Sequence, residues 1–405
     1  MASEPGPRRA WLGLPAGIWA LGFVSLLADI GSEMVHSLLP VFLLGLGTSV
    51  AMIGLIEGVA ESTALMVKVF SGVLSDRMGR RKPLAVLGYS MGALAKPLFA
   101  VAGGAGLVFG ARMIDRVGKG IRGAPRDALV ADLAPPGMVG AAFGLRQALD
   151  SVGAFLGPLI AIGLMLAWAG DIRAVFWVAA VPGLLAVALL VFGVREPAAT
   201  KSAAAARPNP ISRANLRRLG AAYWWVVAIG AAFTLARFSE AFLVLRVHEG
   251  GLPLAWVPLV LVAMNVVYSA LAYPLGRLAD SVRHSTLLVI GLLFLIAADG
   301  LLAWSNQAAF AWSGIALWGV HMALTQGLLA TMVAQTAPSD LRGTAFGFFN
   351  LVSGVAMLLA SVLAGLLWDG IGAGATFVAG AVLAGLTLIL VVLRERRSVG
   401  ALASD

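Results

Sequence analysis

Long apolar stretches are the feature that most constrains how this chain can fold. Twelve of them occur, and each is long enough to cross the hydrocarbon core of a bilayer as a helix, which takes about 20 residues. Hydrophobic residues make up 60% of the 405 residues and charged residues only 12%, against about 25% in a soluble domain. We therefore expect an all-α membrane protein with twelve transmembrane helices. The predicted spans are 14–43, 50–75, 83–103, 106–131, 139–168, 172–194, 221–246, 253–275, 284–304, 309–335, 343–368 and 372–393.

Basic residues are distributed unevenly over the loops between these spans. Twenty of the 29 Lys and Arg residues flank the spans on the side of the N-terminus, whereas the loops on the other side contain only Arg173 and Arg246. Cytoplasmic loops of membrane proteins are enriched in Lys and Arg. The distribution predicts a multi-pass protein of the plasma (inner) membrane with both termini in the cytoplasm. The net charge of +9 then reflects topology, and we expect no nucleic-acid partner.

The two halves of the sequence repeat one another. Gly72 and Asp76 recur as Gly276 and Asp280 after a shift of 204. A polar, Pro-rich segment of low complexity separates the halves, as a flexible linker would. Duplicated halves related by an axis along the membrane normal are a transporter architecture. We therefore expect two pseudo-symmetric six-helix bundles, residues 1–195 and 219–405, joined by a cytoplasmic linker at 196–218.

The loop after the second span combines glycines, an aspartate and four basic residues. It reads Gly72-Val-Leu-Ser-Asp76-Arg77-Met-Gly79-Arg80-Arg-Lys. This pattern resembles the loop signature of the major facilitator superfamily (MFS), and the second copy keeps Gly276, Leu278, Asp280 and Arg283 without the basic run. The resemblance covers nearly the whole chain and implies the MFS fold of a secondary transporter. It also implies a cytoplasmic gate formed by Gly72, Asp76, Arg77, Gly79, Arg80 and Asp280.

Acidic residues lie inside the first span. Asp29, Glu33 and His36 share one face of a helix, because they are four and three residues apart. An ionised group inside the bilayer is costly unless it faces water or a partner. Asp29 and Glu33 are therefore candidates for a proton or cation coupling site in a central cavity. The alternative is a structural ion pair with basic residues of the fourth and fifth spans.

The second span carries Glu57 and Glu61 one helical turn apart. Two like charges at this spacing disfavour each other's ionised form, so that one carboxyl group holds a proton more readily. We expect a proton carrier at this pair, with Glu61 as the deeper member. The alternative is that Lys68 or Lys96 simply neutralises the pair.

The fourth span is the richest in charge. Its charged residues follow one another mostly at helical spacing, which places them on one face: Arg112, Asp115, Arg116, Lys119, Arg122 and Arg126. Such a stripe predicts a water-filled cavity, where it attracts anions or holds carboxylates. The segment from Arg116 to Ala124 resembles the fourth-helix motif of the superfamily. The resemblance implies that Arg116 couples protonation to transport, while Lys119 stands where the family has glutamine.

The fifth span begins with Arg146 and Asp150, two further candidates for coupling. Gly153 and Gly157 follow at a spacing that permits close approach of another helix, and Pro158 predicts a kink. This run resembles the antiporter motif of the superfamily, although the glycine pair that follows in the family is missing. The resemblance implies an exporter, whereas a packing motif alone would imply no direction.

Fewer charges fall inside the spans of the second half. Arg237 and Glu240, three residues apart, are expected to neutralise each other. We expect coupling to reside in the first half and substrate contacts in the second. The candidates for a second-half cavity are Glu240, Asn265, His321 and Gln326.

These features predict a secondary active transporter that exports a small molecule in exchange for protons by alternating access, without a cofactor. An alternative cargo is a divalent metal ion (nickel, cobalt or iron), because Asp29, Glu33 and His36 offer oxygen and nitrogen ligands. A membrane enzyme or a receptor is disfavoured, since the sequence has no cysteine, no phosphate-binding loop and only short loops. We expect a monomer whose partners are membrane lipid, a small-molecule substrate and protons.

Overall fold

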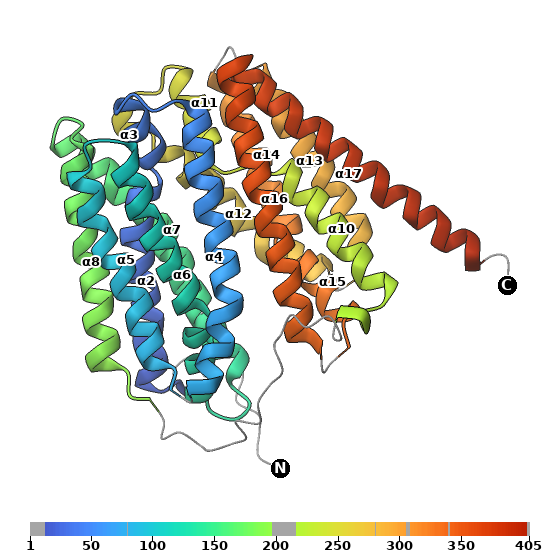
Figure 1. Cartoon of the computed structure of the whole chain (residues 1–405), viewed down its shortest axis with the longest axis horizontal. Coiled ribbons are helices and arrows are strands. Elements are labelled where there is room, and N and C mark those ends of the chain that lie inside the picture. Colours follow the sequence, from blue (N-terminus) through green and yellow to red (C-terminus); the bar gives the residue numbers. More distant parts are fainter. Residues whose placement is uncertain are drawn as a thin grey trace. The chain divides into compact units, whose positions relative to one another are not determined.

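The computed structural model describes residues 13–78, 80–196, 216–279, 281–304, 308–338 and 341–402, without the side chains of residues 73, 76, 77, 279 and 395–402. The described residues form helices and connecting turns and contain no strand (Figure 1). Two compact units make up the chain. Unit 1 comprises residues 1–39 and 66–207, and unit 2 comprises residues 40–65 and 208–405. The predicted all-helical membrane architecture is thus confirmed.

Unit 1 is a bundle of long helices. α5 packs against α6 and α8, and α2 packs against α7 and α8. The C-terminal part of α4 also belongs to this unit, whereas its residues 50–65 belong to unit 2. The bounds are α2 (Ala16–His36), α4 (Val50–Met78), α5 (Lys82–Val101), α6 (Ala105–Leu133), α7 (Val139–Ala167) and α8 (Ile172–Gly193).

Unit 2 is built from long helices and several short ones. α13 packs against α14 and α17, and α10 packs against α16 and α17. The bounds are α3 (Leu39–Gly45), α10 (Ala221–Ala236), α11 (Ala241–Glu249), η2 (Leu254–Trp256), α12 (Leu259–Ala279), α13 (His284–Ala303), α14 (Ala308–Thr325), α15 (Leu328–Thr336), α16 (Arg342–Gly370) and α17 (Ala373–Leu402).

The helices match the predicted spans closely. Among the described residues, eleven helical segments are long and apolar enough to cross a membrane. α6, the predicted fourth span, has 29 residues but carries too many charges to qualify by composition alone. Its charges therefore need partners inside the protein or contact with water.

Four predicted spans differ from expectation, because each is interrupted rather than continuous. The first is divided into α2 and α3 at Ser37 and Leu38. Pro40 accounts for this break, since proline has no N–H to donate to the carbonyl of His36 four residues earlier and its ring clashes with that carbonyl.

The other three interruptions lie in unit 2. In the eighth span η2 ends at Trp256 and α12 begins at Leu259. The seventh span breaks at Arg237, whose backbone is extended (φ −117°, ψ 94°), and Ser239 Oγ accepts a hydrogen bond from Ala241 N at the start of α11, at 3.3 Å. The tenth span breaks at Gln326 and Gly327, between α14 and α15. Discontinuous helices in membrane proteins are tolerated where protein or water satisfies the freed backbone groups.

The apolar core of unit 1 explains why these helices stay together. Side chains from α2, α5, α6, α7 and α8, and from residues that flank α2 and α8, meet in one cluster: Leu14, Ile18, Leu21, Val24, Ala28, Ala85, Tyr89, Leu129, Val130, Ala142, Leu145, Ala186, Leu190 and Val194. The opposite face of α8 exposes Trp177, Leu184 and Phe192. Exposed large apolar side chains of this kind are the expected surface towards lipid.

Candidate functional site

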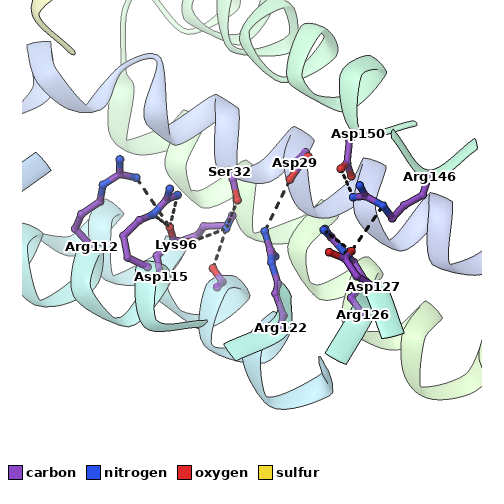
Figure 2. A network of polar contacts seen from close by, with 12 residues as sticks. Asp29, Ser32, Lys96, Arg112, Asp115, Arg122, Arg126, Asp127, Arg146 and Asp150 are labelled. Atoms are coloured by element: carbon purple, nitrogen blue, oxygen red, sulfur yellow. Dashed lines mark hydrogen bonds and ion pairs between the residues drawn. The ribbon is translucent and has the colours of Figure 1, made fainter. Parts of the chain in front are cut away.

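The charged stripe of α6 is directed into unit 1. Arg112, Asp115, Arg116 and Arg122 are all buried, although each carries a full charge in its ordinary state. Asp115 lies close to Lys96 of α5, and Arg122 lies close to Asp29 of α2 (Figure 2). Arg112, Arg116 and Arg122 each lie within ion-pair distance of an aspartate.

Asp115 is the centre of one cluster. Its Oδ2 accepts hydrogen bonds from Arg116 Nε and Nη2 at 2.9 and 2.7 Å. Lys96 Nζ of α5 lies 3.7 Å from Oδ1, and Arg112 Nη1 lies 3.9 Å from Oδ2. A single carboxylate thus interacts with three cations inside the bundle.

Arg122 links α6 to the acidic face of α2. Its Nη2 lies 3.8 Å from Asp29 Oδ1, and its guanidinium group lies 4.4 Å from the centroid of the Tyr89 ring. The cation–π contact and the ion pair both hold the guanidinium group in place. Asp29 thus forms an ion pair with a basic residue of the predicted fourth span.

A third cluster joins α6 and α7 (Figure 2). Arg146 forms an ion pair with Asp150 one turn further along α7 and donates a hydrogen bond to Gln147 Oε1 at 2.9 Å. Its Nε lies 3.8 Å from Asp127 Oδ1 of α6. Asp127 in turn accepts a hydrogen bond from Arg126 Nε at 3.1 Å. Arg146 and Asp150, predicted as coupling residues, lie together in this cluster.

The other predicted residues of α2 lie near the end of that helix. His36 Nδ1 is 3.5 Å from Glu33 Oε2, and Lys119 and Arg116 act on Glu33 electrostatically. Among the described residues there is no group of three or more His, Cys, Asp or Glu side chains that could hold a metal ion. The metal-exporter alternative built on Asp29, Glu33 and His36 thus finds no support.

Gly153 and Gly157 bring the backbones of α7 and α2 close together. A Cβ atom on Gly153 would lie 2.7 Å from Leu26 O, and one on Gly157 would lie 2.7 Å from Ile30 O. Both distances are shorter than any normal contact, so only glycine fits. This contact fixes α2, with Asp29 and Glu33, against α7, and Pro158 lies within α7 directly after it.

The glutamate pair of α4 belongs to unit 2. Glu57 is buried and Glu61 is half-buried. Gly58 between them packs against α16, because a Cβ there would lie 3.0 Å from Ser361 Cβ. Lys96, one of the two lysines predicted as a neutralising partner of this pair, lies at Asp115 in unit 1 instead.

The polar candidates of unit 2 are dispersed. Arg237 Nη2 lies 3.5 Å from Glu240 Oε1, the predicted mutual pair. His321 is fully buried, its Nδ1 lies 2.8 Å from Gly291 O, and its ring stacks on Phe233 at 5.3 Å. Asn265 is half-buried on α12, and Gln326 is exposed at the break before α15.

The predicted cytoplasmic gate is described only in part. Gly72 of α4 packs against α6, where a Cβ would lie 3.4 Å from Ala124 Cβ, and Arg80 is exposed. Gly79, Asp280 and the side chains of Asp76 and Arg77 lie outside the described residues.

The next two residues of this loop complete its basic run but were not among the predicted gate residues, and they connect α5 to its neighbours. Arg81 Nη1 lies 3.0 Å from Asp132 Oδ2 at the end of α6. Lys82 Nζ donates hydrogen bonds to Val191 O and Val194 O, both at 2.7 Å.

The sequence prediction underestimates how central Asp115 and Lys96 are to the charged cluster. It treats Asp115 only as one member of the α6 stripe, and Lys96 only as a partner for the glutamates of α4. The signal is nevertheless present, because a lysine in the middle of an apolar span must find a partner or lose its charge.

Charged clusters inside a bundle of membrane-spanning helices are typical of integral membrane transporters. The sequence profile described as "Major Facilitator Superfamily" matches residues 21–361 and 257–404. The chain belongs to the major facilitator superfamily.

Known relatives agree with this assignment. The chain is 31% identical over 391 residues to an uncharacterized MFS-type transporter of Methanocaldococcus jannaschii, covering 93% of this chain and 95% of the relative. It is 28% identical over 347 residues to the multidrug resistance protein MdtH of Aeromonas hydrophila, covering 83% of each. The crystal structure of a POT family transporter in complex with a thioalcohol-conjugated peptide shares the fold, with a TM-score of 0.77, 13% identity, and coverage of 97% of this chain and 98% of that one.

Proposed function

We propose that this transporter exports a small molecule in exchange for protons by alternating access. The observation that carries the proposal is the set of carboxylate–cation contacts within unit 1, above all half-buried Asp29 with buried Arg122 and half-buried Asp150 with buried Arg146. Protonation of such a carboxylate removes its attraction for the guanidinium group, and a conformation that depends on the pair then loses stability. The similarity to a multidrug resistance protein favours export over import.

The proposed roles follow from these positions. Asp29, Glu33 and Asp150 exchange protons, with Arg116, Lys119 and Arg146 as the cations that sense the change. Glu57 and Glu61 form a second acidic pair for coupling. Gly153, Gly157 and Pro158 hold α7 against α2 and, as in the antiporter motif, favour export.

The remaining roles concern the gate and the second half. The residues that close the cytoplasmic side are Gly72, Asp76, Arg77, Gly79, Arg80 and Asp280. Glu240, Asn265, His321 and Gln326 contact the substrate. We place the protein in the inner membrane as a monomer with both termini in the cytoplasm, and divide it into bundles 1–195 and 219–405 around the linker 196–218.

Proton flux in liposomes tests the proposal. The purified chain would be reconstituted with the pH-sensitive dye pyranine inside, and three probes of different charge would be added in turn: ethidium, norfloxacin and fluorescein. We expect at least one probe to evoke a proton flux that empty liposomes do not show. No flux with any of the three would contradict proton-coupled transport of such molecules.

Variants would then show which residues couple proton movement to substrate transport. Asp29→Asn, Glu61→Gln and Arg116→Met are each expected to lower the probe-evoked flux by about tenfold, which corresponds to about 1.4 kcal/mol. Asp171→Asn serves as the matched control, because Asp171 caps the start of α8 and lies outside the charged clusters. Unchanged coupling in all three variants would overturn the assigned roles.

A further inference from the structure

One carboxyl group of unit 2 lies entirely inside the protein. Asp299 on α13 is 0% exposed. Neither of its carboxylate oxygens has a hydrogen-bond partner or an ion pair in the described part of the chain. A Cβ on Gly380 of α17 would lie 2.5 Å from Asp299 Oδ2 and 2.9 Å from Phe238 Cε1. The carboxyl group therefore occupies a space that the glycine leaves beside the ring of Phe238.

The surroundings of this carboxyl group are aromatic. The ring centroid of Phe238 lies 5.6 Å from that of Trp318 on α14, 5.4 Å from that of Phe377 on α17 and 5.4 Å from that of Phe242 on α11. All four rings are buried. An aromatic ring has a negative face and carries no charge that could neutralise a carboxylate. These neighbours therefore disfavour an anion at Asp299.

The ionisable side chains of the helices packed against α13 have contacts elsewhere. These helices are α14, α15 and α17. On α14 the one ionisable side chain is His321, whose Nδ1 lies 2.8 Å from Gly291 O, eight residues or about 12 Å along α13 from Asp299. α15 has none. The ionisable side chain of α17 that the structure describes, Arg394, lies 5.2 Å from the Trp225 ring centroid.

Arg246 of α11 caps the end of α13 beyond Asp299. Its Nε donates a hydrogen bond to Leu302 O at 2.8 Å, and its Nη2 donates one to Ala303 O at 3.4 Å. Its Nη1 lies 3.3 Å from Glu249 Oε2. The guanidinium group is thus engaged by backbone carbonyls and by another carboxylate, and among the described residues Asp299 forms no ion pair with it.

α13 and α14 repeat the packing of α5 and α6, 203 residues further along the chain. Gly88 of α5 and Gly118 of α6 approach closely, since a Cβ on Gly118 would lie 2.6 Å from Gly88 O. The corresponding residues are Gly291 and His321, and Gly291 O lies 2.8 Å from His321 Nδ1. Positions separated by 203 residues can therefore be compared between the two units.

This comparison places Asp299 at the position of Lys96 and Trp318 at that of Asp115. In unit 1, Lys96 Nζ lies 3.7 Å from Asp115 Oδ1. In unit 2, an uncharged tryptophan stands where the partner of opposite charge would be, and its Nε1 has no hydrogen-bond partner in the described part of the chain. Unit 2 thus keeps an ionisable residue at this position without the ion pair that would fix its charge.

A neutral carboxylic acid fits these surroundings. Burial of an isolated carboxylate costs far more than burial of a neutral polar group, and such a group takes up a proton instead. We propose that Asp299 is a proton-binding group of the transport cycle, protonated in this conformation and ionised in another. This inference rests on the proposed proton coupling and adds a group in unit 2 to those named in the first half.

The interruption of the seventh span offers a way to release the proton. Phe238 lies in this interruption, between α10 and α11, next to Arg237, whose Nη2 lies 3.5 Å from Glu240 Oε1. Discontinuous helices form the ion sites of many transporters. A shift of this segment moves the Phe238 ring away from the carboxyl group and admits water, which takes up the proton and solvates the carboxylate. Uptake of a proton from water restores the buried, neutral form.

Infrared spectroscopy tests proton binding without a substrate. A protonated carboxyl group has a C=O stretching band that a carboxylate lacks, and ¹³C labelling of aspartate carboxyl groups shifts this band. An ordinary aspartate, with a pKa of about 4, is ionised at about pH 7. At that pH, in a detergent without carbonyl groups, we expect the full-length wild-type spectrum minus that of Asp299→Asn to contain the band. Asp171→Asn is the control, and its difference spectrum should contain none.

The absence of the band from the Asp299→Asn difference spectrum would overturn the inference. Should this variant not fold, Asp299→Leu takes its place, because leucine has a similar size and cannot bind a proton.

Transport then tests the role in the cycle. Asparagine has the shape of the protonated carboxyl group but cannot release a proton. In the pyranine liposomes, Asp299→Asn is expected to lower the probe-evoked proton flux by at least about tenfold, whereas Asp171→Asn retains it. Equal flux in the two variants would overturn the role of Asp299 in the cycle and leave proton-coupled export intact. A wild-type chain that moves no protons with any probe would instead refute the proposed function, and the two failures are distinguished by the flux of the unmodified chain.

Discussion

Two aspartates of this chain show how differently one residue type behaves inside a membrane bundle. Asp115 interacts with three cations in unit 1. Asp299 of α13, in unit 2, is fully buried, and neither of its carboxylate oxygens has a hydrogen-bond partner in the described part of the chain. The cations around Asp115 stabilise its ionised form. No described residue near Asp299 would compensate a negative charge there. Substitution of the aspartate by asparagine should therefore change the stability of the protein very differently at the two positions.

Removal of the charge at Asp115 should destabilise the protein strongly. Asp115→Asn leaves Lys96, Arg112 and Arg116 buried without their common counter-charge, and breaking such a pair costs about 3–5 kcal/mol. We expect a clear fall of the unfolding temperature in detergent, followed by tryptophan fluorescence. The control is Asp132→Asn on the same helix, because Asp132 pairs with Arg81 at the surface, where a pair is worth about 0–1 kcal/mol. Equal losses in both variants would contradict a special role for Asp115.

Substitution of Asp299 by asparagine should change the unfolding free energy little. Asp299→Asn keeps the shape of the side chain, which fits tightly because a Cβ on Gly380 would lie 2.5 Å from Oδ2. A buried polar group without a partner is itself costly, and a charged one far more so. We expect the unfolding free energy to change by less than about 1 kcal/mol or to rise. A loss as large as that of Asp115→Asn would show that Asp299 has an ionic partner.

At the scale of elements, glycines decide how closely the helices of unit 1 approach. Gly88 and Gly118 face each other across α5 and α6, since a Cβ on Gly118 would lie 2.6 Å from Gly88 O. The contact of Gly153 and Gly157 with α2 is of the same kind. Close backbone approach of this sort is how helices associate in lipid, where the hydrophobic effect offers no driving force. The charged side chains of α2, α6 and α7 meet because the helices that carry them can come this close.

A larger residue at Gly157 should separate α7 from α2. Gly157→Val places methyl groups against Ile30 O and Glu33 Cβ, and overpacking of a tight contact costs about 1–3 kcal/mol. We expect a lower unfolding temperature and a weaker proton flux, since Asp29 then shifts relative to Asp150. Gly163→Val is the matched control on the same helix, because a Cβ there has no atom within 4 Å. A control variant that is just as unstable would mean that valine disturbs α7 itself.

For the molecule as a whole, the orientation in the membrane is the property that the sequence predicts and a simple experiment can test. The chain has no cysteine, so single cysteines can be introduced without background. Ser49, between α3 and α4, is exposed and is expected outside, whereas Ser202 belongs to the predicted cytoplasmic linker. In intact cells, a membrane-impermeant maleimide should label Ser49→Cys fully and Ser202→Cys only after lysis. The reverse pattern would invert the proposed topology.

Local sequence is sufficient to locate the helices of this protein. The predicted first span begins at residue 14 and α2 begins at Ala16; the predicted fifth span, 139–168, corresponds to Val139–Ala167. Such boundaries follow from local composition, because a bilayer requires about 20 apolar residues in a row whatever the rest of the chain does. Spacing along one helix likewise pairs Arg146 with Asp150. Arg237 and Glu240 pair across the break between α10 and α11, because they are only three residues apart.

Which charge meets which on different helices depends instead on how the helices pack. On sequence grounds Lys96 is as good a partner for Glu57 and Glu61 as for Asp115, and Asp29 has several arginines within reach. The pairing of charges on different helices is decided by how each helix is rotated and how closely it packs. These depend in turn on contacts such as Gly31 with Lys96 and Gly153 with α2. These contacts join residues far apart in the chain, so no local pattern contains them.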